Sequence, residues 1–264
     1  MSFRDKVVWI TGASSGYGEA MAKAFSQAGA KLILSSRRQE KLAALAFELG
    51  QAVALPLDQA DMASFKEKTE CAIAAFGQVD YFILNGALAQ NSPILHSNPS
   101  VERHIMDVDY FSHTELTRCI PPHMLERESG HIVAISGLLA HIHLPGRSTY
   151  AAAKAALIAY FGCLRTELAQ NNIHITVLIP GAMQTGLASK AIKADWKPGD
   201  AVSDETISTT GCPLGEAVDQ SLKAITERKR QTYIGLEDSS YHLWKLTLND
   251  PEQGIQALLD QLGK

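Results

Sequence analysis

The 264-residue chain lacks a long apolar run, a surplus of positive charge and any closely spaced cysteine pair. Its longest uncharged apolar stretches are far shorter than the roughly 20 residues that cross a bilayer, so we expect no membrane span. Lys and Arg number 24 and Asp and Glu 28, a net charge of −4, so no basic field would attract nucleic acid. The four cysteines form no CxxC pair, which argues against a disulfide framework or a zinc site: Cys71, Cys119, Cys163 and Cys212.

What remains is the composition of an ordinary globular protein, with 46% hydrophobic and 20% charged residues. The first six residues lack the apolar segment of a signal peptide, and we expect a cytoplasmic protein with free thiols. No repeat or Pro/Gly/Ser linker interrupts the first 180 residues. We therefore predict one domain over 1–264, with a core at 5–185 and a substrate loop and C-terminal part at 186–264.

Short apolar runs alternate with helix-length segments along the chain. Buried runs of this kind suit strands covered on both faces, so the pattern predicts an α/β, doubly wound parallel sheet of Rossmann type. The predicted strands lie at 7–10, 32–34, 52–55, 81–84, 131–135, 173–179 and 232–234. The predicted helices lie at 17–28, 38–49, 61–76, 101–127, 148–170 and 213–228, and further helices with an apolar face around Trp244 follow.

Three glycines follow the first predicted strand. Gly12 permits a tight turn, Gly16 lets a pyrophosphate approach the backbone at a helix N-terminus, and Gly18 lets that helix pack closely on the sheet. An ordinary glycine-rich turn is the alternative, but the position between strand and helix favours a dinucleotide site. The residues predicted to hold the cofactor here are Gly12, Ser14, Ser15, Gly16, Tyr17 and Gly18.

The ends of the next three strands carry further cofactor candidates. The second strand ends in Ser36-Arg37-Arg38 without the acid that would bind a ribose 2′-hydroxyl, and two guanidinium groups suit a 2′-phosphate instead. We therefore predict NADP(H), with a solvated basic helix start as the alternative. Asp58, followed by Gln59, either accepts from adenine or caps a helix. The fourth strand ends in Asn85, Gly86 and Ala87, which leave room beside a ribose.

Tyr150 and Lys154 are four residues apart in a strongly helical segment, so they share one helix face. An ammonium beside a phenol favours the phenolate and lowers the tyrosine pKa. Such a tyrosine exchanges a proton with a hydroxyl or carbonyl oxygen. On its own this spacing is as typical of an ordinary pair on a helix surface.

Together these motifs resemble the short-chain dehydrogenase/reductase family over residues 5–185. The resemblance implies hydride transfer between a nicotinamide and a carbonyl or alcohol carbon of a small-molecule substrate. It implies that Tyr150 is the acid/base, that Lys154 binds the nicotinamide ribose, and that Thr185, after Pro180 and Gly181, meets the carboxamide. Arg37 matches the family's NADP-type position. The resemblance also implies a homodimer or homotetramer formed through 101–127 and 148–170.

Two members of the family's catalytic set are replaced. Where the family has a serine thirteen residues before the tyrosine, this chain has Gly137, and the adjacent Ser136 is expected to face the other side of the strand. Where the family has an asparagine in the preceding helix, this chain has Asp109, which is also a catalytic candidate. The fourth-strand motif is permuted as well, to Asn85-Gly86-Ala87 from Asn-Ala-Gly.

These replacements leave three hypotheses. The leading one is an NADP(H)-dependent oxidoreductase that interconverts an alcohol and its ketone or aldehyde. The second is a lyase or isomerase on the same fold, with Asp109 or a histidine as base. The third is an NADP(H)-binding module with little catalysis. His141 or His143 is a possible substitute for the missing serine, although a surface role is typical of such residues, and we predict no metal site.

Overall fold

Seven parallel strands form a single sheet in the order β3-β2-β1-β4-β5-β6-β7. In this computed structural model, residues 2–197, 211–236, 239–261 and 263 are described. The strands are β1 (Val7–Thr11), β2 (Lys31–Ser35), β3 (Ala52–Ala54), β4 (Tyr81–Leu84), β5 (Gly130–Ile135), β6 (Ile173–Pro180) and β7 (Gln231–Ile234). The predicted doubly wound α/β fold is confirmed, because the strand order reverses at β1, with β2 on one side and β4 on the other.

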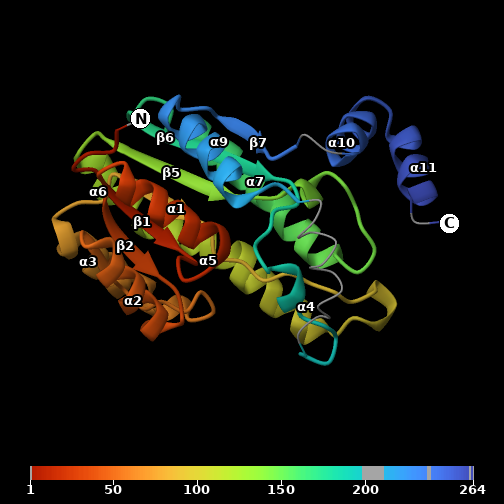
Figure 1. The fold of residues 1–264 in the computed structure, drawn as a ribbon, viewed down its shortest axis with the longest axis horizontal. Helices are drawn as coiled ribbons and strands as arrows, with labels where there is room; N and C mark the ends of the chain where they lie inside the picture. The colour runs from red at the N-terminus through yellow and green to blue at the C-terminus, as the bar shows by residue number, and fades with distance from the viewer. Residues whose placement is uncertain (1, 198–210, 237–238, 262, 264) are drawn as a thin grey trace.

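Helices cover both faces of the sheet, as Figure 1 shows. Alternate residues of a strand point to opposite faces, so β1 sends Val8 and Ile10 into one core and Val7 and Trp9 into the other. One layer contains α1 (Gly16–Gln27), α2 (Gln39–Leu49) and α9 (Leu214–Thr226). The other contains α3 (Phe65–Phe76), α5 (Ser112–Cys119), α6 (Pro121–Glu126) and α7 (Ser148–Glu167).

The segment predicted as one helix over 101–127 is divided in the structure, which corrects that prediction. It forms α4 (Pro99–Met106), a π-helical turn at Asp107–Phe111, α5 and then α6, which starts at a proline pair. Proline lacks an amide hydrogen and favours the first turn of a helix, which accounts for the break before Pro121. The π-helical turn matters for the site because Asp109 lies in it.

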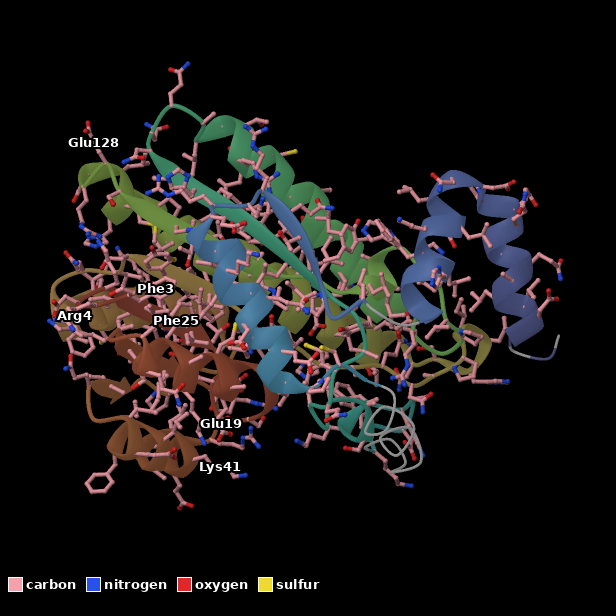
Figure 2. All side chains as sticks on the ribbon, turned by 45° about the horizontal axis from the view of Figure 1, so that its top comes forward. Phe3, Arg4, Glu19, Phe25, Lys41 and Glu128 are labelled. Atoms are coloured by element: carbon pink, nitrogen blue, oxygen red, sulfur yellow. The ribbon has the colours of Figure 1, made fainter. Side chains whose placement is uncertain are left out.

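Aromatic packing ties the N-terminal segment to the first helix. The rings of Phe3 and Phe25 lie edge to face with their centroids 4.8 Å apart, and both side chains are buried (Figure 2). The ring of Phe3 also meets that of Tyr81 on β4, at 5.3 Å. These contacts fix the start of β1, the strand that leads into the glycine-rich loop.

After β6 the chain builds the wall of the site. A short turn at Ala188–Lys190 lies in the predicted substrate loop, and most of the remainder of that loop, 198–210, lies outside the described residues. The last helices are α10 (Ser239–Asn249) and α11 (Pro251–Gln261), and the Trp244 ring packs on Tyr233 at 4.2 Å. Among the described residues no helix is both long and apolar enough to cross a membrane.

Candidate active site

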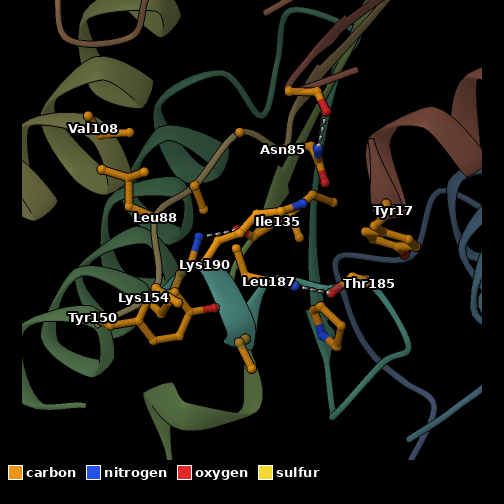
Figure 3. A pocket seen from close by; sticks show the side chains of 18 of the residues that line it. Tyr17, Asn85, Leu88, Val108, Ile135, Tyr150, Lys154, Thr185, Leu187 and Lys190 are labelled. Atoms are coloured by element: carbon orange, nitrogen blue, oxygen red, sulfur yellow. Dashed lines mark hydrogen bonds between the residues drawn. The ribbon is translucent and has the colours of Figure 1, made fainter. Parts of the chain in front are cut away.

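One cavity of about 870 Å³ opens along the carboxyl ends of the strands, where ligands bind in sheets of this kind. It extends from the glycine-rich loop at one end to Tyr150 and the substrate loop at the other (Figure 3). Its volume is near the upper limit of ordinary ligand pockets, roughly 300–1,000 Å³. It is lined by the residues predicted to hold the cofactor, with the exception of Gly18, which packs against the glycine-rich loop instead.

The glycine-rich loop is fastened to the end of β4. The Thr11 hydroxyl accepts hydrogen bonds from the amides of Asn85 (3.0 Å) and Gly86 (3.3 Å), and the Asn85 side chain donates to the Thr11 carbonyl (3.1 Å). A Cβ at Gly12 would lie 2.6 Å from the Gly86 Cα, and one at Gly18 would lie 2.5 Å from the Gly12 carbonyl oxygen. Both positions therefore require glycine, and the Asn85 side chain shapes the loop.

Arg38 connects the end of β2 to the same loop. Its guanidinium donates to the Ser14 hydroxyl at 2.8 and 3.0 Å and to the Ser15 hydroxyl at 2.6 Å. Arg37 lines the cavity beside it. The two arginines thus stand at the point where a cofactor's adenosine ribose would meet the loop, and Arg38 already has a fixed position there.

Asp58 and Gln59 follow β3 and have separate roles. Asp58 lines the cavity, and its carboxylate accepts from the Ala60 amide at 3.0 Å in a local turn. The alternative role as a helix cap is wrong, because the residue at the N-cap of the following helical turn is Asp61. The Gln59 amide donates to the carbonyls of Gly86 and Val108, each at 3.1 Å, and to the Ser112 hydroxyl at 2.9 Å.

The Gln59 side chain also explains the permuted motif on β4. A Cβ at position 86 would overlap the Gln59 side-chain oxygen. An alanine at this position would displace the Gln59 side chain from its hydrogen bonds, and the alanine of this chain falls one place later, at Ala87. The permutation and the glutamine are thus two parts of one packing arrangement.

The chemical end of the cavity lies on α7. The Lys154 ammonium is 5.5 Å from the centre of the Tyr150 ring and donates to the Ile135 carbonyl at 3.2 Å (Figure 3). The pKa of Tyr150 is raised, which corrects the prediction that the neighbouring ammonium lowers it: burial raises this pKa, the Asp109 charge raises it further, and the opposing effect comes from Arg147. Burial lowers the pKa of Lys154, which is 1% exposed, against the opposing effect of Asp109.

Asp109 lies behind Lys154, in the π-helical turn. One carboxylate oxygen accepts from the Leu88 amide at 2.7 Å, and the other is 4.0 Å from the Lys154 ammonium without a hydrogen-bond partner among the described residues. Burial raises the pKa of Asp109 to about 7, despite the lowering effects of Lys154 and the Leu88 amide. Asp109 is fully buried and is absent from the described lining of the cavity, so it acts on Lys154 rather than on a substrate.

The position of the missing serine is open. Gly137 has an extended backbone with φ −179°, and a Cβ there would lie 3.5 Å from the Tyr150 hydroxyl and 3.8 Å from Lys154 Cγ. A side chain at this position would therefore fit without strain and face the tyrosine. Ser136 instead donates to the Lys154 carbonyl at 2.7 Å and is buried, so it anchors α7 and leaves Gly137 without a replacement hydroxyl.

Neither candidate histidine substitutes for that serine. The His141 ring packs on Tyr233, with 3.4 Å between its Nε2 and the phenol oxygen, and His143 is exposed. Ile142 lines the cavity between them, whereas neither histidine is among the described lining residues. Within the described part of the chain no group of three or more His, Cys, Asp or Glu side chains could hold a metal.

The remaining predicted residues close the cofactor end. Gly181 follows β6 and donates its amide to the Ile234 carbonyl at 2.9 Å, next to Pro180 at the strand end. Thr185 lies over the glycine-rich loop, because a Cβ at Gly16 would be 3.1 Å from its carbonyl oxygen. The Tyr17 hydroxyl bonds to Ser221 of α9, so this side chain joins two helices although the residue lines the cavity.

Sequence reasoning missed Gln90, which positions the catalytic helix. Its fully buried side chain accepts hydrogen bonds from the amides of Thr149 (2.7 Å) and Tyr150 (3.3 Å), in the first turn of α7. Its backbone pairs with Ile192 of the substrate loop, and its carbonyl accepts from the Arg147 guanidinium. Helix amides at an N-terminus lack partners within the helix, so Gln90 supplies them from a distant segment. No local motif signals such a contact.

The residues present fit a dinucleotide. The first turn of α1 presents amides without intrahelical partners to the cavity. The side chain of the N-cap residue, Ser15, forms no hydrogen bond with these amides. The glycine-rich loop admits close backbone approach, and Arg37 and Arg38 supply positive charge near it. Tyr150 and Lys154 would meet the nicotinamide half at the other end of the same cavity.

Comparison with known proteins agrees with this geometry. The family model described as short chain dehydrogenase matches residues 6–196. Dehydrogenase/reductase SDR family member 7B of Bos taurus is 36% identical over 241 residues, which cover 88% of this chain and 74% of the relative. A short-chain dehydrogenase/reductase of Burkholderia phymatum in complex with NAD superposes with a TM-score of 0.84, at 21% identity and 96% coverage of each chain. A short chain dehydrogenase of Burkholderia cenocepacia in complex with NADP superposes at 0.78, with 23% identity and 99% coverage of each.

Proposed function

The chain belongs to the short-chain dehydrogenase/reductase family, and from this premise we propose that it is an NADP(H)-dependent oxidoreductase that reduces a ketone or aldehyde to the alcohol. The observation that carries the proposal is the placement of Tyr150 and Lys154 at one end of a cavity whose other end holds the glycine-rich loop and Arg38. A family match and a nucleotide site alone would also fit a protein that binds the nucleotide without catalysing a reaction. The tyrosine and lysine beside the cavity add a proton donor and a cation.

The choice of NADP(H) rests on Arg37 and Arg38. A 2′-phosphate would meet two guanidinium groups at the end of β2, and Arg38 is held in place by two serine hydroxyls. An arginine fork matches the oxygens of a phosphate. NAD-type recognition needs a carboxylate at this strand end, where this chain has Ser36.

In the proposed reaction the bound nicotinamide supplies a hydride to the carbonyl carbon. Tyr150 donates its phenolic proton to the carbonyl oxygen as the carbon–oxygen π bond breaks, and the Lys154 ammonium stabilises the phenolate that remains. Burial and the Asp109 carboxylate both raise the pKa of Tyr150, so the phenol holds its proton until a substrate oxygen accepts it. The protonated phenol is the form that the reduction of a carbonyl requires.

The test is transfer of deuterium from NADPH labelled at the hydride position. A panel of ketones and aldehydes, some neutral and apolar and others apolar with one anionic group, is incubated with the protein, and the alcohols are analysed by mass spectrometry. We expect products that carry one deuterium and an equal amount of NADP⁺. A product without deuterium and without NADPH consumption would instead identify a lyase or isomerase. Tight NADPH binding without any product across the panel would identify a binding module.

An NADP(H)-binding module with little catalysis remains the second candidate function, because Gly137 has no hydroxyl to offer a substrate oxygen. Loss of a single oxyanion donor typically costs about 10²–10³ in rate. The lyase or isomerase hypothesis has less support, because Asp109 lies behind Lys154 and the two histidines lie away from the cavity.

We also propose that copies of the chain form a homodimer or homotetramer through the outer faces of α4, α5 and α7. Phe111 is 45% exposed on this surface and borders a shallow hollow shared with Met106 and Ala152. Sedimentation at micromolar concentration should give a dimer or larger species, and a monomer would contradict the proposal. The cytoplasmic location remains a prediction from the sequence.

A further inference from the structure

The described lining of the cavity is strongly unbalanced in charge, although the whole chain has a net charge of −4. Its only acidic side chain there is Asp58, at the nucleotide end. Two of the cations, Arg37 and Arg38, stand at that same end, and Lys154 has Asp109 at 4.0 Å behind it. The cations that line the cavity are Arg37, Arg38, Arg147, Lys154 and Lys190. Arg147 and Lys190 are therefore left for the substrate end.

Arg147 is the more unusual of these two, because it is half-buried and lacks an acidic partner among the described residues. One guanidinium N–H donates to the Gln90 carbonyl, and no other hydrogen bond of this side chain is formed within the described chain. Arg127 provides the contrast, since its guanidinium pairs with Asp80 at 2.8 Å. Burial lowers the pKa of Arg147, which reports the cost of removing a cation from water. Proteins normally offset this cost with an anion.

The surfaces around Arg147 in the cavity are apolar. The apolar lining residues between Gly137 and Arg147 are Leu138, Leu139, Ile142 and Leu144, and the segment after β6 adds Leu187, Ile192 and Trp196. Burial of such a wall favours an apolar ligand. A wholly neutral ligand would leave the Arg147 guanidinium desolvated and without a counter-charge.

We propose that the substrate of this site is an amphipathic carbonyl compound whose anionic oxygen group, a carboxylate or a phosphate, is bound by Arg147 while its apolar body fills the leucine-lined wall. The inference rests on the proposed function, because it assigns the substrate end of the same cavity. Arg147 precedes α7 by one residue and influences the Tyr150 pKa. The anion is therefore held on the side of the cavity where Tyr150 meets the reacting oxygen.

Arginine suits this role better than Lys190 does. The guanidinium has five N–H groups in a planar fork, which binds two oxygens of a carboxylate or phosphate at once. Lys190 is exposed, so water screens its charge. The assignment therefore predicts that removal of Arg147 changes ligand preference and that removal of Lys190 changes it little.

The experiment measures equilibrium binding to the full chain saturated with NADP⁺, by calorimetry, and needs no turnover. The probes are decanoate, decyl phosphate and the neutral decanamide, which share one apolar chain. We expect at least one of the two anions to bind about tenfold or more tightly than decanamide. The anion that binds more tightly identifies which source the site prefers. In Arg147→Gln the three dissociation constants should converge, whereas Lys190→Gln should retain the preference.

Three results would overturn the proposal: equal affinity for all three probes, absence of binding by any of them, or an anion preference that survives in Arg147→Gln. Thermal unfolding of each variant shows whether it is folded. Should Arg147→Gln fail to fold, Arg147→Lys must keep the anion preference with a weaker affinity, because it retains the charge and loses the fork. A preserved anion preference with no deuterium transfer would reject the proposed reaction and leave this binding assignment intact.

Discussion

At the nucleotide end of the cavity, hydrogen bonds from Thr11, Asn85 and Arg38 hold a glycine-rich loop whose shape depends on the backbone. At the catalytic end, the outcome depends on a few side-chain groups, and two of these differ from the family pattern, at Gly137 and Asp109. The comparison shows that the two ends of the cavity depend on different parts of the chain. Binding relies on close backbone approach, whereas proton transfer relies on single hydroxyl, amine and carboxyl groups.

The strongest test of the catalytic end is Tyr150→Phe. Removal of the phenol hydroxyl should lower kcat by about 10³-fold, since general acid catalysis contributes roughly 10²–10⁴. NADPH affinity should change little if the two ends are as separate as the contacts indicate. Steady-state rates and NADPH fluorescence titration measure the two effects. Tyr160→Phe on the same helix is the matched control, and a Tyr150→Phe rate within tenfold of the parent would exclude this residue from proton transfer.

The second test concerns the buried carboxyl. Asp109 has a pKa of about 7 in the folded protein and roughly 3.9 when unfolded, so between these pH values it takes up a proton on folding. The folded state then binds more protons than the unfolded state, so this group's contribution to stability falls as pH rises toward 7. Asp109→Asn should therefore gain stability relative to the parent between pH 5 and pH 8, on the order of 2 kcal/mol.

Urea unfolding at several pH values measures this difference. Ser112→Ala is the control, because it alters the same buried cluster at a group that does not titrate. Its stability difference from the parent should be the same at every pH. If the stabilities of the parent and of Asp109→Asn change in parallel with pH, Asp109 is ionised in the folded protein throughout this range. A simple ion pair with Lys154 would require that result.

Arg38→Ala tests the nucleotide end by itself. Loss of a charge-assisted contact to the 2′-phosphate should weaken NADPH binding by about tenfold and leave NADH binding nearly unchanged. Calorimetric titration with both cofactors gives the ratio. Lys41→Ala, an exposed cation on the neighbouring helix α2, controls for the general loss of positive charge. Equal weakening for both cofactors would mean that Arg38 only supports the loop.

The smallest expected effect, and the most direct comparison of the two ends, comes from Gly137→Ser. The extended backbone accepts a side chain, and the new hydroxyl would stand near that of Tyr150. We expect kcat to rise by about threefold to tenfold, less than the 10²–10³ lost when such a donor is removed from a site adapted to it. Gly137→Ala separates the hydroxyl from the added volume. A fall in rate for both variants would show that the substrate occupies this space.

Much of the fold followed from local pattern. Runs such as Val7–Ile10 and Ile173–Ile179 are apolar and β-rich because both faces of a parallel sheet are buried, and their predicted bounds lie within one residue of the strands. The roles of the glycines in the first loop could also be predicted, because the close packing at Gly12 and Gly18 belongs to a local strand–loop–helix motif.

Contacts between distant segments were out of reach. Gln90 binds the first turn of α7 from about 60 residues away, and no propensity or spacing in either segment indicates it. The sequence also contains no indication that Arg147 lines the cavity. Its partial burial and its lack of an acidic partner depend on how distant loops fold. The break before α6 has a local signal in Pro121, which the sequence prediction did not use. The π-helical turn has none, because it keeps nearly helical periodicity while it shifts the faces of the residues after Asp107.

The contact between Gln59 and Gly86 also constrains the order in which this sequence can change. Replacement of Gly86 by alanine would push the glutamine side chain out of its present position, because the new methyl group would overlap its side-chain oxygen. A smaller residue at position 59 would remove that obstacle and would also release Ser112 and two carbonyls from their shared donor. A change to the Asn-Ala-Gly order therefore disturbs the hydrogen bonds of Gln59 unless position 59 changes with it. For an engineer who recombines related sequences, β3 and β4 are best exchanged together.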